Sequence, residues 1–399
     1  MILSQAKYSY TPYEMRKCIR GEDFWKYKKD LKKDTVDEVS ENASIYFNSI
    51  NNQLANINCT SLRGSRVFTT NSIEETLCSR RTDQILRRSL NIYPANRNNE
   101  VKQLITILRT EPYGYILRTD ITSFFESVDL CKVIEKLENE GLRNPSCLKY
   151  LKALNQTLIN EFKHTGLPRG LPCSSTLGEF ILKELDQSLT TLPTVIFYSR
   201  FVDDISIVFL DKKLNIKDRI LKLLPLDLEL NSRKTKSSSL TNNSKIDYLG
   251  YSIGLGNNKF VEISDSKIGK AKKRIVLSLK RYLKDKDFNL LKDRIKFLTS
   301  NIIIKKASRE SSVCTGYRYD YMHCTDNEII HQLSKLDQFF MSIIYSKRYW
   351  IGVTLRKTLK KTQIEELKKL SFKSGYTSKI THKMARDRIS RIKEAWKYE

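Results

Sequence analysis

The chain has 399 residues and carries 71 Lys and Arg against 45 Asp and Glu, a formal net charge of +26 at pH 7. A charge of that sign and size indicates a polyanionic partner, and nucleic acid is the leading candidate. The alternative interpretation is a solvated, lysine-rich surface. No apolar run approaches the ~20 residues of a membrane-spanning helix and residues 1–8 lack the layout of a secretory signal, so we expect a cytoplasmic protein without membrane contact.

The first 110 residues are expected to be largely helical and increasingly basic. Residues 1–60 place apolar residues at helical spacing among charged clusters, which predicts a helical extension that packs on the rest of the chain or contacts a partner. From residue 61 onward arginines accumulate. For any single one of them, a solvated helix face is the more common explanation. They are Arg63, Arg66, Arg80, Arg81, Arg87, Arg88 and Arg97.

Residues 195–209 are two apolar, β-branched and aromatic runs with Asp203 and Asp204 between them. This pattern predicts a β-hairpin with two carboxylates at its tip. Adjacent carboxylates repel each other, and one pKa rises unless a cation lies between them. Upstream, an apolar strand ends at Asp120, and hard divalent cations take a few carboxylates together with water and phosphate oxygens. Asp120, Asp203 and Asp204 are therefore candidate metal ligands, although a solvated turn would explain the Asp203–Asp204 pair alone.

Further motifs accompany the aspartates in a fixed order. Phe125 stands five residues after Asp120, and the other motifs are Leu167-Pro168-Arg169-Gly170 with Ser174 after it, Asn231 to Lys234-Thr235, and Tyr248-Leu249-Gly250-Tyr251. Together with Phe201-Val202-Asp203-Asp204, they resemble the ordered motifs of the reverse transcriptases. The resemblance implies an α+β right-hand polymerase, with an N-terminal helical extension at 1–60, fingers at 61–110, an antiparallel-sheet palm at 111–262 containing a fingers insertion near 140–165, and a helical thumb with C-terminal helices at 263–399.

The resemblance also implies a site for two-metal nucleotidyl transfer. In it Asp120 and Asp203 bridge two Mg²⁺ ions, for which Mn²⁺ can substitute, while Asp204 supports them. The main-chain carbonyl of Ile121 is a further candidate ligand. Lys234 stands where the family places a lysine that protonates or electrostatically assists the leaving group, and a surface lysine on a turn is the alternative interpretation.

Nucleotide contacts are implied around that site. Phe125 would close the space that a ribose 2′-hydroxyl needs, which favours deoxynucleotides. Pro168, Gly170 and Pro172 form a stiff loop that can lie against base and sugar. Pro168, Arg169 and Gly170 are its candidate nucleotide contacts, although this chain has Arg169 where the family has glutamine. Among the arginines, Arg97 is the best candidate for a triphosphate or template contact. The candidates for a primer grip are Tyr248, Leu249 and Gly250.

Residues beyond 263 are predicted to be basic and helical. Residues 267–283 carry an apolar stripe with lysines opposite, as in a thumb that follows a duplex backbone or in any solvated amphipathic helix. Residues 315–321 interleave tyrosines with an arginine, which suits base stacking or burial. Further helices are expected near 327–348 and 360–398.

Three functions stay open at this point. The first is an RNA-directed DNA polymerase, favoured by Asp120, Phe125, Asp203 and Asp204 together. The second is a polymerase of the same fold that needs no template or primes from a protein hydroxyl, and the third is a catalytically silent RNA-binding scaffold. Among reverse transcriptases the chain is most similar to bacterial defence-associated (DRT and abortive-infection) and retron-like enzymes. That similarity implies dNTPs, a noncoding RNA template, a DNA product, assembly with a second reverse transcriptase subunit, and antiphage defence.

Overall fold

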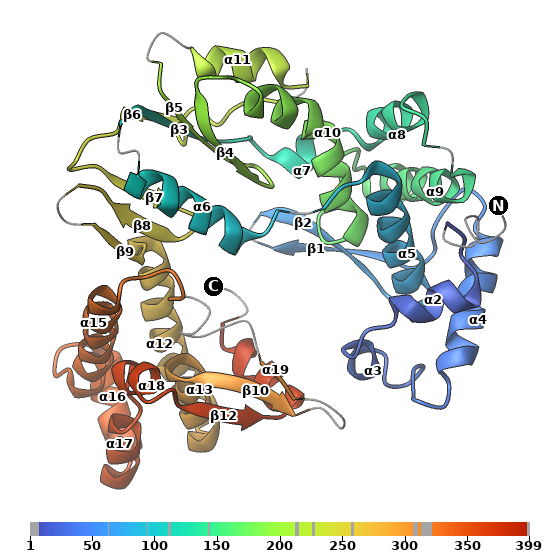
Figure 1. The fold of residues 1–399 in the computed structure, drawn as a ribbon. Coiled ribbons are helices and arrows are strands. Elements are labelled where there is room, and N and C mark those ends of the chain that lie inside the picture. Colours follow the sequence, from blue (N-terminus) through green and yellow to red (C-terminus); the bar gives the residue numbers. More distant parts are fainter. Residues whose placement is uncertain are drawn as a thin grey trace. The chain divides into compact units, whose positions relative to one another are not determined.

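The computed structural model, drawn in Figure 1, divides into two compact units. One unit contains residues 1–100 and 113–240, and the other contains residues 101–112 and 241–399. The boundaries expected for fingers, palm and thumb stay a prediction, and Arg63 and residues 315–320 lie outside the described part of the chain. The structure describes residues 8–62, 64–93, 95–110, 113–142, 144–211, 215–225, 228–256, 259–305, 310–312 and 321–396.

A four-stranded antiparallel sheet lies in the first unit. Its order is β4-β5-β3-β6, with bounds β3 Tyr115–Asp120, β4 Val195–Phe201, β5 Asp204–Phe209 and β6 Lys236–Ser239. The hairpin predicted for residues 195–209 is confirmed as β4 and β5. Strand β5 pairs with β4 on one side and with β3 on the other, and its apolar residues are buried. The hairpin is therefore anchored in the sheet through β5.

Helices pack against this sheet and against each other. Helix α10 (Pro172–Thr190) contacts β4 and α5, and α8 (Leu130–Asn139), α9 (Pro145–Phe162) and α11 (Ile216–Leu223) complete this part of the unit. Asp129 caps α8 by accepting from the amides of Cys131 and Lys132. Helix α10 begins with Pro172, whose fixed φ suits a first helical turn.

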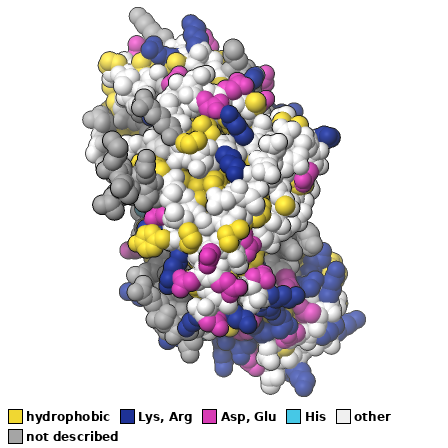
Figure 2. All heavy atoms as spheres, turned by 90° about the vertical axis from the view of Figure 1, so that its right-hand side faces the viewer, with side chains coloured by type: hydrophobic (Ala, Val, Ile, Leu, Met, Phe, Trp, Pro, Cys, Tyr) yellow, Lys and Arg dark blue, Asp and Glu magenta, His cyan; other side chains and the backbone are white. Residues whose placement is uncertain are grey.

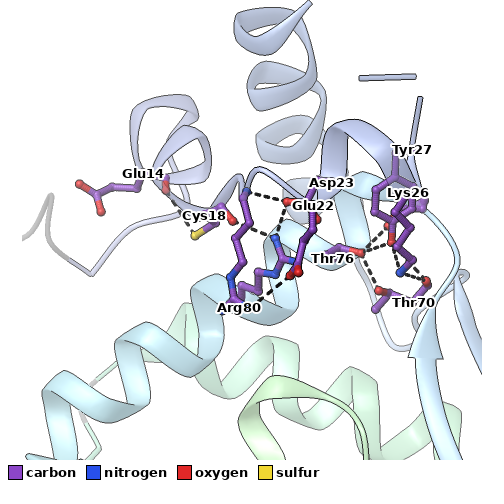
Figure 3. Close-up of polar contacts among 11 residues, drawn as sticks. Glu14, Cys18, Glu22, Asp23, Lys26, Tyr27, Thr70, Thr76 and Arg80 are labelled. Carbon is purple, nitrogen blue, oxygen red and sulfur yellow. Dashed lines mark hydrogen bonds and ion pairs between the residues drawn. The ribbon is translucent and has the colours of Figure 1, made fainter. Parts of the chain in front are cut away.

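The N-terminal segment contains α2 (Pro12–Cys18), α3 (Asp23–Lys26) and α4 (Val36–Ser49), followed by the hairpin of β1 (Ile57–Leu62) and β2 (Ser65–Thr70) and by α5 (Ile73–Leu90). Two buried arginines of α5 fasten it. Arg80 donates to both carboxylate oxygens of Asp23, at 2.6 and 2.9 Å, and to the carbonyl of Cys18 (Figure 3). Arg81 pairs with Glu14 at 2.7 Å. Removing Arg80 would leave the buried carboxylate of Asp23 without its close cationic partner, and removing Arg81 would leave Glu14 with Lys17 alone, so both arginines have a structural role.

The second unit begins within α6 (Arg97–Thr110) and continues with an antiparallel sheet of β7 (Lys245–Tyr248), β8 (Tyr251–Gly254) and β9 (Phe260–Ile263). Its helices are α12 (Asp265–Asp285), α13 (Phe288–Thr299), α15 (Asp326–Tyr345), α16 (Trp350–Thr358), α17 (Lys361–Lys368), α18 (Phe372–Thr377) and α19 (Arg386–Glu394). A small sheet joins β10 (Asn301–Lys305) with β11 (Glu310–Ser312) and β12 (Thr381–Met384).

The expectation of helices alone near 360–398 is wrong in one respect. Strand β12 interrupts them, because residues 381–384 pair in parallel with β10.

The basic excess of the sequence is visible on the surface, where Figure 2 shows Lys and Arg side chains gathered densely toward the lower end of one face. No helix among the described residues combines the length and apolar content that a bilayer crossing needs.

Candidate active site

Strand pairing brings two of the three predicted aspartates together. Asp120 ends β3 and Asp204 begins β5, and the two are direct partners across the antiparallel ladder. The amide of Ile121 donates to the carbonyl of Asp203 at 3.1 Å, which continues the pairing beyond the strand end. Side chains of directly opposed residues project from the same face of a sheet, so the carboxylates of Asp120 and Asp204 share one face.

The tip of the β4–β5 hairpin is a two-residue loop formed by Val202 and Asp203. Val202 has φ 63°, a left-handed conformation that is unfavourable for a β-branched residue. Arg200 holds the loop by donating to the carbonyl of Val202 at 2.9 Å, and it pairs with Asp186 of α10 at 2.6 Å. The strained tip is therefore fixed to the helix that packs on β4.

The electrostatics of the aspartates indicate a shortage of positive charge. Burial, followed by the charges of Asp120 and Asp204, raises the pKa of Asp203. Burial and the charge of Asp120 likewise raise the pKa of Asp204, and Arg118, whose Nη2 lies 3.9 Å from Asp204 Oδ1, opposes this shift. A cation among the carboxylates would lower the cost of ionising them.

Lys234 forms an ion pair with Asp120. Asn231 donates its amide to the carbonyl of Asp120 at 2.7 Å, and Thr235 and Thr119 share a hydroxyl hydrogen bond at 2.7 Å, so the turn before β6 is fixed to the end of β3. The Nζ of Lys234 then lies 2.7 Å from Asp120 Oδ2, although 62% of the lysine side chain is exposed. This hydrogen bond raises the pKa of Lys234, which stays protonated at neutral pH.

The oxygen donors of the site are of the type that a hard cation prefers, but their present arrangement does not bring three side chains around one ion. Three carboxylates and a main-chain carbonyl are the oxygens that Mg²⁺ prefers. Among the described residues, however, no three His, Cys, Asp or Glu side chains are placed to hold one ion. Asp120 is turned to Lys234 and Asp204 lies near Arg118. Binding an ion therefore requires these carboxylates to exchange a cationic side chain for it, and the Ile121 carbonyl stays a predicted ligand.

Phe125 belongs to the short helix α7 (Phe124–Ser127), which follows Asp120 closely. Phe124 is buried and meets the Phe125 ring edge-on at 5.4 Å between centroids. The guanidinium carbon of Arg169 lies 5.1 Å from the centre of the Phe125 ring. Arg169 also pairs with Glu126 at 3.3 Å. The arginine that replaces the family's glutamine thus contacts the residue predicted to select the sugar.

Hydrogen bonds fasten the loop of Pro168, Arg169 and Gly170 to its surroundings. The carbonyl of Arg169 accepts from the amide of Phe68 at 2.7 Å, which fastens the loop to β2, and Ser174 donates to the carbonyl of Pro168 at 2.6 Å. Gly170 has φ 105°, and a Cβ there would lie 2.5 Å from the carbonyl oxygen of Phe68. Only glycine fits this position, and the contact of the loop with a nucleotide stays a prediction.

The remaining predicted residues belong to other elements of the fold. Arg97 is the first residue of α6. Tyr248 ends β7 with its side chain buried, and Leu249 and Gly250, at φ 43° and 82°, form the two-residue loop to β8 in the other unit. Their roles as triphosphate and primer contacts stay predictions.

Two residues of the site were missed by sequence reasoning. Arg118 could have been found, because it precedes Asp120 by two positions on β3 and therefore lies on the same face of the strand. Glu126 gave no such signal, because its pairing with Arg169 depends on where α7 turns.

The paired strands, the carboxylate-bearing hairpin and the covering helices define an α+β domain with antiparallel sheets, as the sequence predicted. Residues 64–253 match the family model described as "Reverse transcriptase (RNA-dependent DNA polymerase)", and the enzymes of that description are nucleotidyltransferases. No curated protein matches the chain. A solved structure of telomerase from Candida albicans, in complex with a TWJ fragment of telomeric RNA, is similar at 11% identity and a TM-score of 0.41; the match covers 93% of this chain and 64% of that one.

Proposed function

We propose that the chain is an RNA-directed DNA polymerase that adds dNTPs to a primer 3′-hydroxyl. The observation that carries this proposal is the placement of Asp120 opposite Asp204 on paired strands, with Asp203 at the adjoining hairpin tip and Lys234 on Asp120. These side chains lie within the segment matched by the reverse transcriptase family. The net charge of +26 supports a nucleic-acid partner.

In the proposed mechanism, Asp120 and Asp203 would hold two divalent ions, and Asp204 would support them. Mg²⁺, or Mn²⁺ in its place, would lower the pKa of the primer hydroxyl and neutralise the triphosphate. Lys234, released from Asp120, would place its ammonium beside the leaving pyrophosphate, whose negative charge favours the protonated amine. Phe125, which contacts Phe124 and Arg169, would exclude a ribose 2′-hydroxyl and so select deoxynucleotides.

The biological setting belongs to the same proposal. The motifs favour a bacterial cytoplasmic enzyme of antiphage defence, templated by a partner noncoding RNA and assembled with a second reverse transcriptase subunit. A basic surface such as that in Figure 2 would suit the RNA partner. Measuring the mass of the complex purified from its host, before and after RNase treatment, would test both partners.

The activity is tested by incubating purified protein with each dNTP and Mg²⁺, with and without its co-purified RNA, and sequencing the product. Templated DNA that disappears after RNase treatment is the expected result. Product that resists RNase would indicate template-independent or protein-primed synthesis, and no product would indicate a scaffold. Asp203→Ala should abolish synthesis, whereas Glu161→Ala, at an exposed acid of α9, should not.

A further inference from the structure

The turn between α15 and α16 exposes three aromatic side chains within six residues. Tyr345 is 43% exposed, Tyr349 70% and Trp350 58%. Lys347 and Arg348 lie between them in the sequence and are exposed as well. Large aromatic side chains gain much from burial, so a cluster of them left in solvent marks an interaction site more often than chance exposure does. We call residues Tyr345–Trp350 the aromatic turn.

The backbone of the aromatic turn is held rigidly. The hydroxyl of Ser346 accepts from the amides of Tyr349 at 2.8 Å and Arg348 at 3.2 Å. Arg356 of α16 donates to the carbonyl of Ser346 at 2.9 Å. A Cβ on Gly352 would lie 2.3 Å from the carbonyl oxygen of Ile343, so α16 packs directly against the end of α15. The exposed rings are therefore presented by an ordered scaffold, which lowers the entropic cost of binding.

Cations surround the rings. Lys280 Nζ lies 5.9 Å from the centre of the Trp350 ring, and Lys368 Nζ lies 5.1 Å from that of Tyr345. Lys347 and Arg348 form no ion pair within the described part of the chain. Flat rings interleaved with cations fit a ligand that alternates planar groups with negative charges. A single nucleic-acid strand has that chemistry, with bases between phosphates.

We infer that the aromatic turn binds unpaired nucleotides of RNA by stacking bases on Tyr349 and Trp350, while Lys347 and Arg348 contact the phosphates. Bases within a duplex offer no free face to a protruding ring, so the occupant is a single-stranded segment. RNA is chosen over DNA because the family matched by residues 64–253 is RNA-dependent, and in this respect the inference rests on the proposed function. The aromatic turn lies outside the matched segment and would hold RNA apart from the templating nucleotides.

The test measures the affinity of the full-length protein for a fluorescein-labelled single-stranded RNA by anisotropy, without dNTPs. Tyr349→Ala and Trp350→Ala should each weaken binding about tenfold, because stacking on one aromatic side chain is worth that much or more per base. Tyr349→Phe should bind like the wild type, since the ring is kept. Tyr93→Ala, at an exposed tyrosine outside the aromatic turn, is the matched control and should also bind like the wild type. Circular dichroism of each variant checks that the helices are intact.

Unchanged RNA affinity in both alanine variants would overturn the inference. So would an equal loss of affinity for duplex RNA, which would point to a phosphate contact without stacking, or tighter binding of the same sequence as single-stranded DNA. Because no nucleotide is added in this assay, its result is independent of the polymerase proposal. Protein that binds RNA through the aromatic turn but makes no DNA would overturn the proposed function alone.

Discussion

The ammonium of Lys234 lies 2.7 Å from Oδ2 of Asp120, so a lysine from the turn before β6 neutralises the aspartate that β3 contributes. Since Lys234 faces carboxylates before metal binds and would face phosphate oxygens afterwards, we expect it to act as a fixed charge more than as a proton donor. Lys234→Met should slow dNTP addition about 100-fold, within the usual range for a charge at a reacting group. Lys234→Arg should restore most of the rate.

Single-turnover addition of one dNTP to a primer annealed to RNA measures this effect. Lys217→Met, at an exposed lysine of α11, is the control and should leave the rate unchanged. An arginine variant as slow as the methionine variant would show that proton donation, and not charge, is what Lys234 supplies.

Asp203 destabilises the fold when it is ionised in the absence of a cation. Burial and the neighbouring carboxylates raise its pKa above the unfolded value, so the native state binds more protons than the unfolded state between these two values. Stability contributed by the protonated carboxyl is therefore lost as pH rises through that window. Asp203→Asn should raise the Tm at neutral pH by a few degrees and abolish DNA synthesis. The gain in Tm should vanish at a pH below the ordinary carboxyl pKa, and a gain that persists there would contradict this explanation.

Divalent ions should offset the destabilisation that ionised Asp203 causes. If the three carboxylates exchange Lys234 and Arg118 for metal, Mg²⁺ at about 100 times its Kd should stabilise the wild type by about 2.7 kcal/mol. The Tm of the wild type should rise accordingly and fall again when EDTA is added. In Asp203→Asn the rise should be much smaller, because one bridging ligand is gone. Equal shifts in both proteins would mean that Mg²⁺ binds elsewhere.

The centre of the site was predictable because its signals are local. The apolar runs on either side of Asp203 and Asp204 predict a hairpin. The apolar run that ends at Asp120 predicts a strand, and this strand pairs with β5 of the hairpin. The arginines of α5 were not interpretable in that way. Arg80 of α5 forms an ion pair with Asp23, which lies 57 positions earlier on α3. Only the fold shows that both side chains are buried.

The same limit applies to residues whose role depends on where an element ends. Tyr349 and Trp350 are exposed because α15 stops at Tyr345 and Ser346 turns the chain, and apolar periodicity locates neither boundary to the residue. The stacking of Arg169 on Phe125 depends likewise on the turn that begins α7.

Sugar selection should depend on Phe125 and on the residue that holds it. Phe125→Ala removes the ring next to the site and should raise the ratio of ribonucleotide to deoxynucleotide incorporation by about tenfold or more. Arg169→Ala should produce a smaller increase, because it removes the guanidinium that lies 5.1 Å from the ring centre but keeps the ring. Competition between dGTP and GTP on a defined template measures the ratio. An unchanged ratio in Phe125→Ala would remove the steric explanation.

Val202 provides a test of the strained hairpin tip. Its φ of 63° is costly for any residue with a Cβ, by about 1–3 kcal/mol, and costs glycine nothing. Val202→Gly should therefore have a higher Tm than Val202→Ala. At an exposed strand position such as Ser237, the order should be reversed, because glycine there loses about 0.5–1 kcal/mol relative to alanine. Both Val202 variants lose the side chain that packs partly against the core, so their difference isolates the backbone. A Val202→Ala protein at least as stable as Val202→Gly would show that the tip relaxes without strain.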